Sequence, residues 1–351
     1  MRFAALYALL LIPGAALCGQ DQKNGTAPSS PVAVARGLET ITADDVRRRI
    51  GIIAHDSMGG RDTPSRGLDL TARYIASEFA RVGLQPAGDS GTFIQRYPLP
   101  VGRPGAPASA SRPTAPNVVG VLEGSDPALR GEYIVISAHM DHVGIGAPVN
   151  GDSIYNGADD DASGTAAVLE LAEALSQPGA RPKRSVVFLT VSGEEHGLWG
   201  SAWFSEHSPV RLTNVVANLN IDMVGRNWKD TIVVIGKEHS DLGATLERVS
   251  RANPQLRMQP IDDLWPEENF YFRSDHYNFA RKGVPVLFFF NGTHPDYHGP
   301  DDEVDRIDAE KEARIVRLIY LLTHEVGNAA ERPQWNPASY RRIVRPAGSG
   351  G

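Results

Sequence analysis

Apolar residues recur along the chain with two different periods, which divide it into expected helices and strands. Between residues 68 and 82 they fall three or four positions apart, the period of an amphipathic helix. Gly83 follows directly and predicts the end of that helix, because glycine readily adopts the left-handed conformation that terminates helices. Thr42 likewise predicts the N-cap of a helix that runs through Val46 and Ile50.

Short, continuous apolar runs alternate with helical segments through the rest of the chain. The runs predict strands at 93–97, 117–122, 133–137, 185–191, 215–221, 231–235 and 284–290. Helices are expected at 164–175, 200–207, 242–251, 274–281 and 309–329. Strands that are apolar throughout are buried on both faces, as in a parallel sheet between two helical layers. The pattern therefore predicts an α/β fold, a three-layer α/β/α sandwich with a mostly parallel central sheet.

The N-terminus departs from this pattern. Residues 3–12 are apolar, follow Arg2 and precede small residues, so we expect a signal peptide over 1–18 and export to the periplasm or the extracellular space. The apolar run is too short to span a membrane. Cys18 is then either removed with the signal or carries a lipid anchor.

Composition bounds the remaining organisation. Residues 19–38 are rich in Gly, Ser and Pro and are expected to form a flexible linker, and residues 332–351 a disordered tail. This leaves one folded domain over 39–331. The net charge of −7 argues against nucleic acid as the main partner, since phosphate binding needs a basic surface. A single cysteine excludes a disulfide-stapled fold.

Polar clusters lie in five loops at the expected sheet ends. They are HMDH at 139–142, DDDASG at 159–164, SGEEHG at 192–197, DMVG at 222–225 and DYH at 296–298. The carboxyl ends of parallel strands share one edge of a sheet, so we expect these side chains to converge. Mixed His and carboxylate ligands without Cys suit zinc. Two metals need a bridging carboxylate, and a further carboxylate is needed as a base.

The motifs HMD, DDDASG, SGEEHG, NIDMVG and DYHGPDD, in this order and spacing, resemble the M28 family of zinc aminopeptidases. The stretches MGGRD at 58–62 and SDH at 274–276 resemble the same family. The resemblance covers most of the chain. It implies the phosphorylase/hydrolase-like sandwich of zinc aminopeptidases, and an exported enzyme that removes the N-terminal residue of peptides with a free N-terminus.

The resemblance also implies two zinc ions per chain and a ligand set. His139 and Asp222 are expected on one zinc, and Glu195 and His298 on the other. Asp160 is expected to bridge the two zinc ions. It is chosen from the three consecutive aspartates by counting back from the Ser-Gly pair that ends the motif.

Four further residues receive roles in the same way. Glu194 matches the general base, and Asp141 matches a carboxylate that orients the ring of His139. Tyr297 occupies the position of a donor to the developing oxyanion. Arg273, which precedes SDH, is a candidate for substrate contact.

Neighbouring polar residues are interpreted more simply. We expect Asp159 and Asp161 to cap the helix that begins near residue 163. The histidines near the clusters are expected to be hydrogen-bonded loop residues rather than ligands: His142, His196, His276 and His294. Trp199 and the aromatic stretch 265–272 belong either to the core or to a substrate pocket.

Two other functions remain open at the level of sequence. A carboxypeptidase or a glutaminyl-cyclase-like enzyme uses the same fold, although the first needs a basic pocket and the second works with one zinc. A non-catalytic binding protein on a decayed peptidase fold is the other alternative, and such a protein usually lacks ligands. All five expected ligand positions are filled here, which favours the aminopeptidase.

Overall fold

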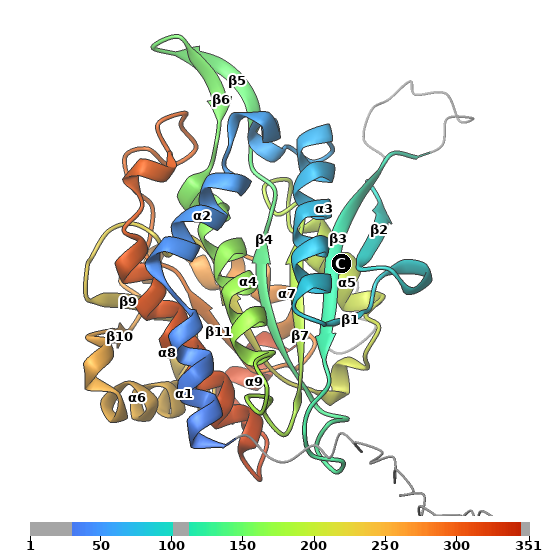
Figure 1. Cartoon of the computed structure of the whole chain (residues 1–351), viewed down its shortest axis with the longest axis vertical. Coiled ribbons are helices and arrows are strands. Elements are labelled where there is room, and N and C mark those ends of the chain that lie inside the picture. The colour runs from blue at the N-terminus through green and yellow to red at the C-terminus, as the bar shows by residue number, and fades with distance from the viewer. Residues whose placement is uncertain (1–29, 101–111, 345–351) are drawn as a thin grey trace, which may run out of the picture.

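A central β-sheet organises the protein in the computed structural model, which describes residues 30–100 and 112–344 (Figure 1). The strand order is β1 (Gln85–Pro86), β3 (Thr114–Leu122), β7 (Ser185–Val191), β4 (Tyr133–His139), β8 (Val215–Ile221), β11 (Val286–Phe289), β9 (Thr231–Ile235) and β10 (Gln259–Ile261). β2 (Ile94–Pro98) pairs with β3 outside this order. The central strands β7, β4, β8 and β11 are parallel, whereas β3 and β9 join them antiparallel.

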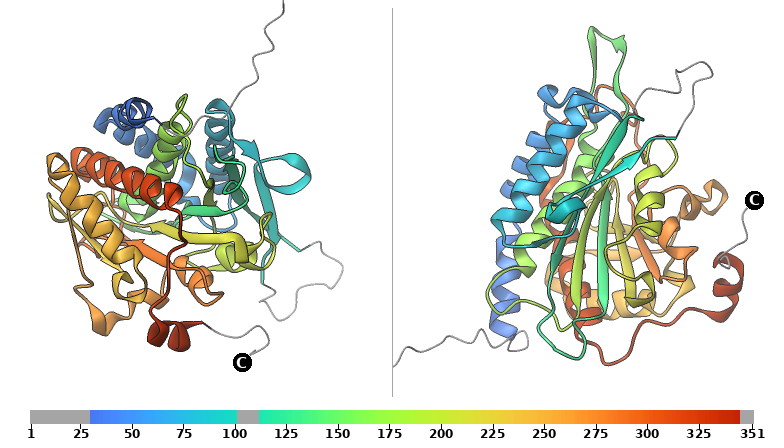
Figure 2. Two further views of the ribbon diagram at one scale, coloured as in Figure 1. Left: turned by 90° about the horizontal axis from the view of Figure 1, so that it is seen from below. Right: turned by 90° about the vertical axis from the view of Figure 1, so that its right-hand side faces the viewer.

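Helices cover both faces of the sheet, as the sequence predicted (Figure 2). One face carries α1 (Pro31–Thr40), α2 (Ala43–Ile53), α3 (Arg66–Arg81), α4 (Gly164–Leu175), α6 (Leu242–Ala252) and α8 (Ala309–Asn328). The opposite face carries α5 (Trp199–Glu206), α7 (His276–Ala280) and α9 (Pro337–Ile343). Within the described part of the chain, no helix is both long and apolar enough to cross a lipid bilayer.

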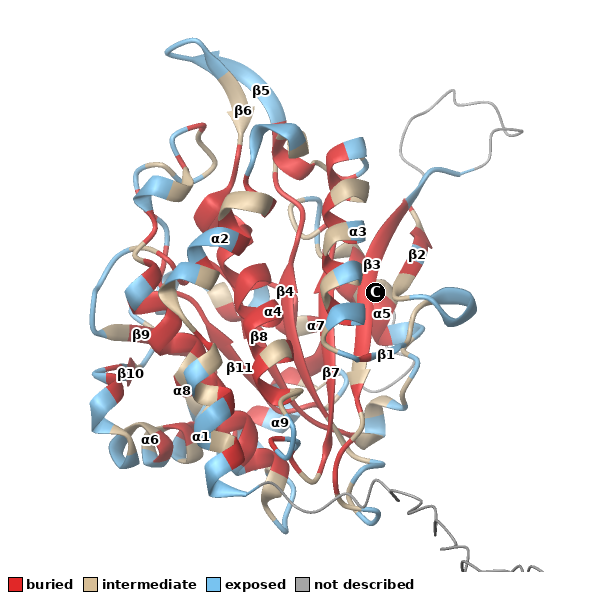
Figure 3. Ribbon diagram, in the orientation of Figure 1, coloured by how far each residue is buried: buried red, intermediate tan, exposed pale blue. Residues whose placement is uncertain are grey.

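The continuous apolar strands are explained by burial on both sides. In β7, Val186 and Phe188 pack into the core under α2, α3, α4 and α8, while Val187, Leu189 and Val191 pack into the core on the other face. Figure 3 shows the inner strands buried along their length. Each such side chain contributes roughly 1.5–3 kcal/mol by leaving water. A polar residue on either face would therefore need a specific partner.

The expected linker is wrong from residue 30 onward, because α1 begins inside it. Ser30 caps this helix by accepting a hydrogen bond from the Ala33 N–H at 3.2 Å. Gly37 packs so closely on α8 that an added Cβ would lie 2.2 Å from the Tyr320 hydroxyl oxygen. Gly and Pro here serve packing and helix initiation rather than flexibility. The signal peptide, Cys18 and the rest of the linker lie outside the described residues.

The expected disordered tail is also wrong over its first part. Trp335 donates through Nε1 to the carbonyl of Gly283 at 2.9 Å and forms a bridge with Ser240, and α9 follows. Residues 345–351 lie outside the described residues.

The predicted helices and strands agree closely with those observed, with a few exceptions. Thr42 caps α2 as expected, accepting from the Asp45 N–H at 3.1 Å. α7 is shorter than the helix predicted at 274–281. The hairpin of β5 (Gly144–Val149) and β6 (Asp152–Tyr155) was not predicted, and it projects from the end of the molecule where β4 ends (Figure 1).

Candidate metal centre

The ends of the parallel strands bring the predicted polar loops together. His139 is the last residue of β4, and Asp222 follows β8 directly. Glu194 and Glu195 lie in the loop after β7. Two groups of ligand atoms result, and within each group every atom lies within 4.8 Å of the others.

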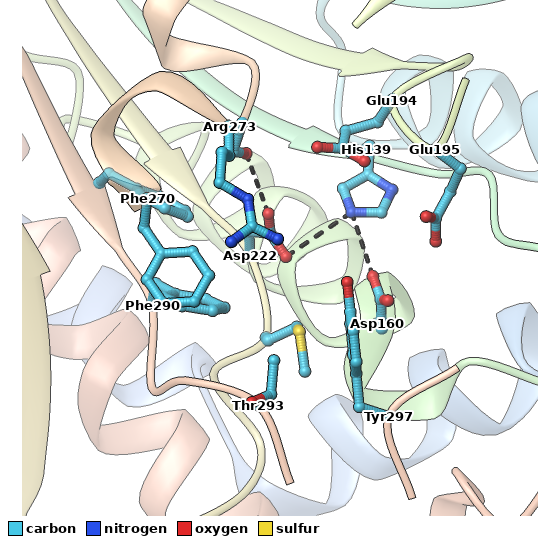
Figure 4. A pocket seen from close by; sticks show the side chains of 13 residues that line it. His139, Asp160, Glu194, Glu195, Asp222, Phe270, Arg273, Phe290, Thr293 and Tyr297 are labelled. Atoms are coloured by element: carbon cyan, nitrogen blue, oxygen red, sulfur yellow. Dashed lines mark hydrogen bonds and ion pairs between the residues drawn. The ribbon is translucent and has the colours of Figure 1, made fainter. Parts of the chain in front are cut away.

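The first group consists of His139, Asp160 and Asp222, all of them buried. Nε2 of His139 lies 3.2 Å from Oδ1 of Asp160 and 3.6 Å from Oδ1 of Asp222 (Figure 4). The three residues come from three separate loops, so their proximity is a property of the tertiary structure.

The second group consists of His142, Asp160, Glu195 and His298. Nε2 of His298 lies 3.1 Å from Oδ2 of Asp160 and 3.1 Å from Oε2 of Glu195. Asp160 thus belongs to both groups, with Oδ1 facing the first and Oδ2 facing the second. A carboxylate that presents one oxygen to each of two donor sets has the arrangement of a bridging ligand.

The donor atoms fit a cation better than they fit one another. Although Nε2 of His298 is close to two carboxylate oxygens, this atom is buried and forms no hydrogen bond of acceptable geometry in the described part of the chain. Burial alone would raise the pKa of Asp160, but His142, His139 and His298 hold it well below its usual value. An ionised, buried carboxylate surrounded by imidazoles is the ligand set that zinc prefers.

His142 lies in the second group of ligand atoms, where the sequence predicted only a hydrogen-bonded loop residue. We expected it to lie outside the ligand set, but its Nδ1 is 3.0 Å from Oε1 of Glu195 and 3.6 Å from Oδ2 of Asp160. It is fully buried, and its Nε2 has no hydrogen-bond partner within residues 30–100 and 112–344. The motif HMDH contained the signal, but local sequence could not decide whether one or both of its imidazoles reach the ligand atoms.

Asp141 supports two loops at once. Nδ1 of His139 lies 3.2 Å from the main-chain oxygen of Asp141 and 3.6 Å from its Oδ1. Oδ2 of Asp141 accepts hydrogen bonds from the Gly193 N–H at 2.6 Å and from the Thr63 hydroxyl at 2.9 Å. The carboxylate therefore ties the end of β4 to the loop that carries Glu194 and Glu195.

A chain of buried hydrogen bonds leads through the sheet to Asp222. Asn218 donates to Ser137, Ser137 donates to Asn220, Asn220 donates to Ser274, and Ser274 donates to Oδ2 of Asp222 at 2.9 Å. These polar residues interrupt otherwise apolar strands, and their mutual hydrogen bonds satisfy them. The chain fixes the orientation of the Asp222 carboxylate.

Glu194 lines an open pocket beside the two donor groups but belongs to neither group. Burial raises the pKa of its carboxyl well above the usual value; His139 opposes the shift, and the acidic side chains Asp275, Asp222 and Glu195 add to it. A carboxylate beside a metal site, with a raised pKa and no role as a ligand, is suited to proton transfer.

The open pocket beside the donor groups has a volume of about 50 Å³. Its apolar wall is formed by Met223, Phe270, Phe288 and Phe290. Figure 4 shows Arg273 pointing into the pocket, and its guanidinium carbon lies 4.7 Å from the centre of the Phe270 ring. Phe270 thus places part of the aromatic stretch 265–272 in the pocket.

Tyr297 lines the pocket opposite Glu194 and stacks on His298, with ring centres 3.9 Å apart. Its hydroxyl-bearing end lies near Asp160 (Figure 4). Burial, followed by the negative charges of Asp160 and Glu195, raises the pKa of this phenol. Tyr297 therefore stays protonated and can donate a hydrogen bond.

The other three histidines near the clusters belong to neither donor group. His196 contacts exposed Asp62 at 2.8 Å and stacks on Trp199, and His276 stacks on Phe288. His294 Nε2 lies 3.3 Å from Oδ2 of Asp159.

The two aspartates beside Asp160 have different partners. Asp161 caps α4 as predicted, accepting from the Gly164 N–H at 2.8 Å. Asp159 does not cap this helix, because its side chain points toward the loop after β8. There its Oδ1 accepts a hydrogen bond from the Gly225 N–H at 2.6 Å.

Comparison with known proteins is consistent with this geometry. The model of Peptidase family M28 matches residues 117–323. A "Probable zinc metalloprotease" of Pyrenophora tritici-repentis is 33% identical over 85% of this chain and 69% of its own length. A "Probable leucine aminopeptidase" of Arthroderma otae is 28% identical over 56% of this chain and 55% of its own length. The LapA aminopeptidase of Legionella pneumophila shares the fold, with a TM-score of 0.64 and 21% identity over 93% of this chain and 81% of that structure.

Proposed function

The chain belongs to peptidase family M28 and is a zinc metallopeptidase. On this basis we propose that the protein is an exported aminopeptidase and that it holds two zinc ions. The observation that carries the two-zinc proposal is Asp160, whose two oxygens each face a separate group of ligand atoms. His139 and Asp222 would complete one zinc site, and Glu195 and His298 the other. His142 is a further candidate at the second site.

Zinc, when bound, would polarise a carbonyl group and lower the pKa of water in the pocket. The protein's own contribution to the reaction is the handling of protons. We assign Glu194 as the general base, which takes a proton from the attacking water and delivers it to the leaving amine. Its raised pKa suits both steps, because a base that is too weak would not accept the proton.

Two further polar side chains that line the pocket, Tyr297 and Arg273, would orient the substrate. The protonated phenol of Tyr297 can donate a hydrogen bond to the oxygen on which negative charge develops. Arg273 points into the pocket (Figure 4), where its half-exposed guanidinium can reach a substrate carbonyl or carboxylate.

The surroundings of the pocket accommodate a free α-amino group. The carboxylates of Asp160, Glu194, Glu195 and Asp222 line one side and would offset the charge of two zinc ions, so the bound metal would not repel an α-amino group. The apolar wall of Met223, Phe270, Phe288 and Phe290 then faces the side chain of the first residue. We therefore propose that substrates begin with an apolar residue and carry an unblocked N-terminus.

The decisive experiment compares leucyl-, aspartyl- and lysyl-4-nitroanilide with N-acetyl-leucyl-4-nitroanilide, with and without a zinc chelator. We expect fastest hydrolysis of the leucyl substrate, no hydrolysis of the acetylated one, and loss of activity in chelator that added zinc restores. Equal cleavage of the acetylated substrate would refute the aminopeptidase assignment. A carboxypeptidase is not favoured, because Arg273 is the single Lys or Arg side chain among the described residues that line the pocket.

Export is proposed from the apolar run at 3–12 and the small residues that follow it. N-terminal sequencing of the protein from a fractionated producing cell tests this. A mature chain that begins after residue 17 or 18 in the exported fraction supports the proposal, and a full-length chain confined to the cytoplasm contradicts it.

A further inference from the structure

Arg61 donates hydrogen bonds to the main chain of Met140 and Asp160, beside the candidate metal centre, but does not line the pocket. It precedes the region matched by the family model and belongs to the short 3-10 helical segment Asp56–Arg61. Its side chain is completely buried. A buried guanidinium is costly unless its charge and its N–H groups are satisfied, so the partners of Arg61 indicate what the residue does.

All five N–H groups of the Arg61 guanidinium donate to main-chain carbonyl oxygens. Nε donates to the carbonyl of Met140 at 2.9 Å. Nη1 donates to the carbonyls of Ile53 at 3.1 Å and Asn156 at 2.5 Å, and Nη2 donates to those of Gly157 at 2.9 Å and Asp160 at 3.4 Å. Five donors in a fixed planar fork can hold five acceptors at set positions, which lysine cannot do.

All of these acceptors except Ile53, the last residue of α2, belong to the segments that carry the proposed zinc ligands. Met140 lies next to His139, while Gly157 and Asp160 belong to the loop of the bridging carboxylate. Arg61 therefore fixes the main chain beside His139 relative to the main chain of Asp160, although the two ligands are separated by 20 intervening residues. The partial negative charges of the carbonyl groups, and the nearby carboxylates Asp160 and Asp141, offset the buried positive charge.

Thr63 extends this connection to a third loop. Its hydroxyl donates to Oδ2 of Asp141 at 2.9 Å and accepts from the Gly193 N–H at 3.1 Å. Gly193 directly precedes Glu194 and Glu195. Thr63 is itself buried, so these hydrogen bonds are shielded from water.

We propose that Arg61 and Thr63 are positioning residues that hold the loops of His139, Asp160 and Glu195 at zinc-binding separation before metal is bound. This inference rests on the proposed two-zinc function. Its physical basis is preorganisation: carboxylates and imidazoles that must be brought together only when metal arrives bind it more weakly. Neither residue touches the substrate pocket, so the effect acts through the ligands.

The test measures zinc affinity of the metal-free protein by competition with a chromophoric chelator. We expect R61Q and T63V to bind zinc roughly 10–100-fold more weakly than wild type. T63S keeps the hydroxyl and should bind zinc as wild type does. Amide hydrogen exchange at 139–142 and 157–162 in the metal-free protein should be faster in R61Q than in wild type.

Arg314 provides the matched control. It is also a buried arginine that donates to main-chain carbonyls, those of Lys229, Leu256, Arg257 and Glu310, and it pairs with Asp230 at 2.7 Å; none of these residues is a proposed zinc ligand. R314Q should lower the melting temperature while leaving zinc affinity unchanged. This separates positioning of the ligands from a general contribution to stability.

Each result decides one question. Wild-type zinc affinity in both R61Q and T63V would overturn the positioning role while leaving the proposed function intact. If R61Q does not fold, the T63V and T63S pair still decides the role of Thr63, and R61K, which keeps the charge but not the planar five-donor fork, decides that of Arg61 by the same zinc competition. Wild-type protein that binds no zinc would overturn the proposed function itself, and with it the positioning role.

Discussion

The hydroxyl of Ser274 donates a hydrogen bond to Oδ2 of Asp222 at 2.9 Å, which leaves Oδ1 of the same carboxylate facing Nε2 of His139 at 3.6 Å. One oxygen is thus held by the protein and the other is free for a ligand role. Asn220 donates to Ser274 in turn, so the carboxylate orientation is set from within the sheet.

We predict that S274A weakens zinc binding at the first site. Without the hydroxyl, the Asp222 carboxylate can rotate, and loss of a hydrogen bond that orients a ligand typically costs roughly 10–100-fold in metal affinity. Chelator competition measures the change, with S274T as the variant that keeps the hydroxyl. Unchanged affinity in S274A would mean that the hydrogen bond does not orient the ligand.

Glu194→Gln should retain zinc and lose turnover. The amide cannot accept a proton, so we expect kcat to fall roughly 10²–10⁴-fold while zinc content stays at the wild-type level. Glu195→Gln is the neighbouring control, because Glu195 belongs to the second donor group and its loss should lower zinc content as well. Wild-type hydrolysis of leucyl-4-nitroanilide by the Glu194 variant would show that the base lies elsewhere.

Tyr297→Phe tests the oxyanion donor. The substitution keeps the ring that stacks on His298 and removes only the hydroxyl. Removal of one such donor typically lowers kcat by roughly 10²–10³-fold, and KM should change little because the contact strengthens in the transition state. A variant with unchanged kcat would restrict Tyr297 to packing against His298.

His142→Ala should weaken the second zinc site selectively. Its Nδ1 lies 3.0 Å from Oε1 of Glu195, so the histidine either binds metal or orients a ligand, and both roles predict loss of affinity. Metal content per chain after dialysis against limiting zinc should fall from two toward one. His196→Ala, at an exposed histidine beside the same loop, should leave two zinc ions bound. Two tightly held zinc ions in the His142 variant would assign that residue to packing alone.

His324 on α8 predicts a pH dependence of stability that is independent of the metal centre. Burial lowers its pKa to about 4 from 6.5, and neither ring nitrogen has a hydrogen-bond partner among the described residues. Above pH 6.5 both folded and unfolded states are neutral at this position. As the pH falls from 6.5 to 4, only the unfolded chain gains the proton, so the free energy of unfolding decreases by about 1.4 kcal/mol per pH unit.

Urea denaturation at pH 7.5 and pH 5 measures this effect. We expect His324→Leu to reduce the loss of stability between the two pH values by about 2 kcal/mol, because leucine does not titrate. The exposed His207 serves as the control, and His207→Gln should behave like wild type. An equal loss of stability in His324→Leu and wild type would contradict the prediction.

Much of the fold and the candidate site was predictable because both depend on local sequence. The continuous apolar runs at 185–191 and 215–221 are strands buried on both faces, and α4 begins and ends at the predicted residues. Polar residues directly after such strands must emerge at one edge of a parallel sheet. The convergence of His139 and Asp222 follows from this rule, whereas Asp160 reaches them from the segment before α4.

The errors arose where composition was taken for conformation. Gly and Pro near residue 31 and after residue 332 suggested flexible ends, but helices α1 and α9 pack there. The same residue types serve either purpose, and the choice depends on what lies across the contact, such as Tyr320 beside Gly37.

The sequence by itself determined most helices and strands of the central sandwich, the order of the sheet-end motifs and the ligand types that suit zinc, because periodicity and residue chemistry are local properties. Only the tertiary structure decided that His142 faces Glu195, that Ser274 holds Asp222, and that Arg61 ties together two ligand loops. Those contacts join residues about 50 to 100 positions apart, and no local pattern specifies which distant main chain a side chain will meet.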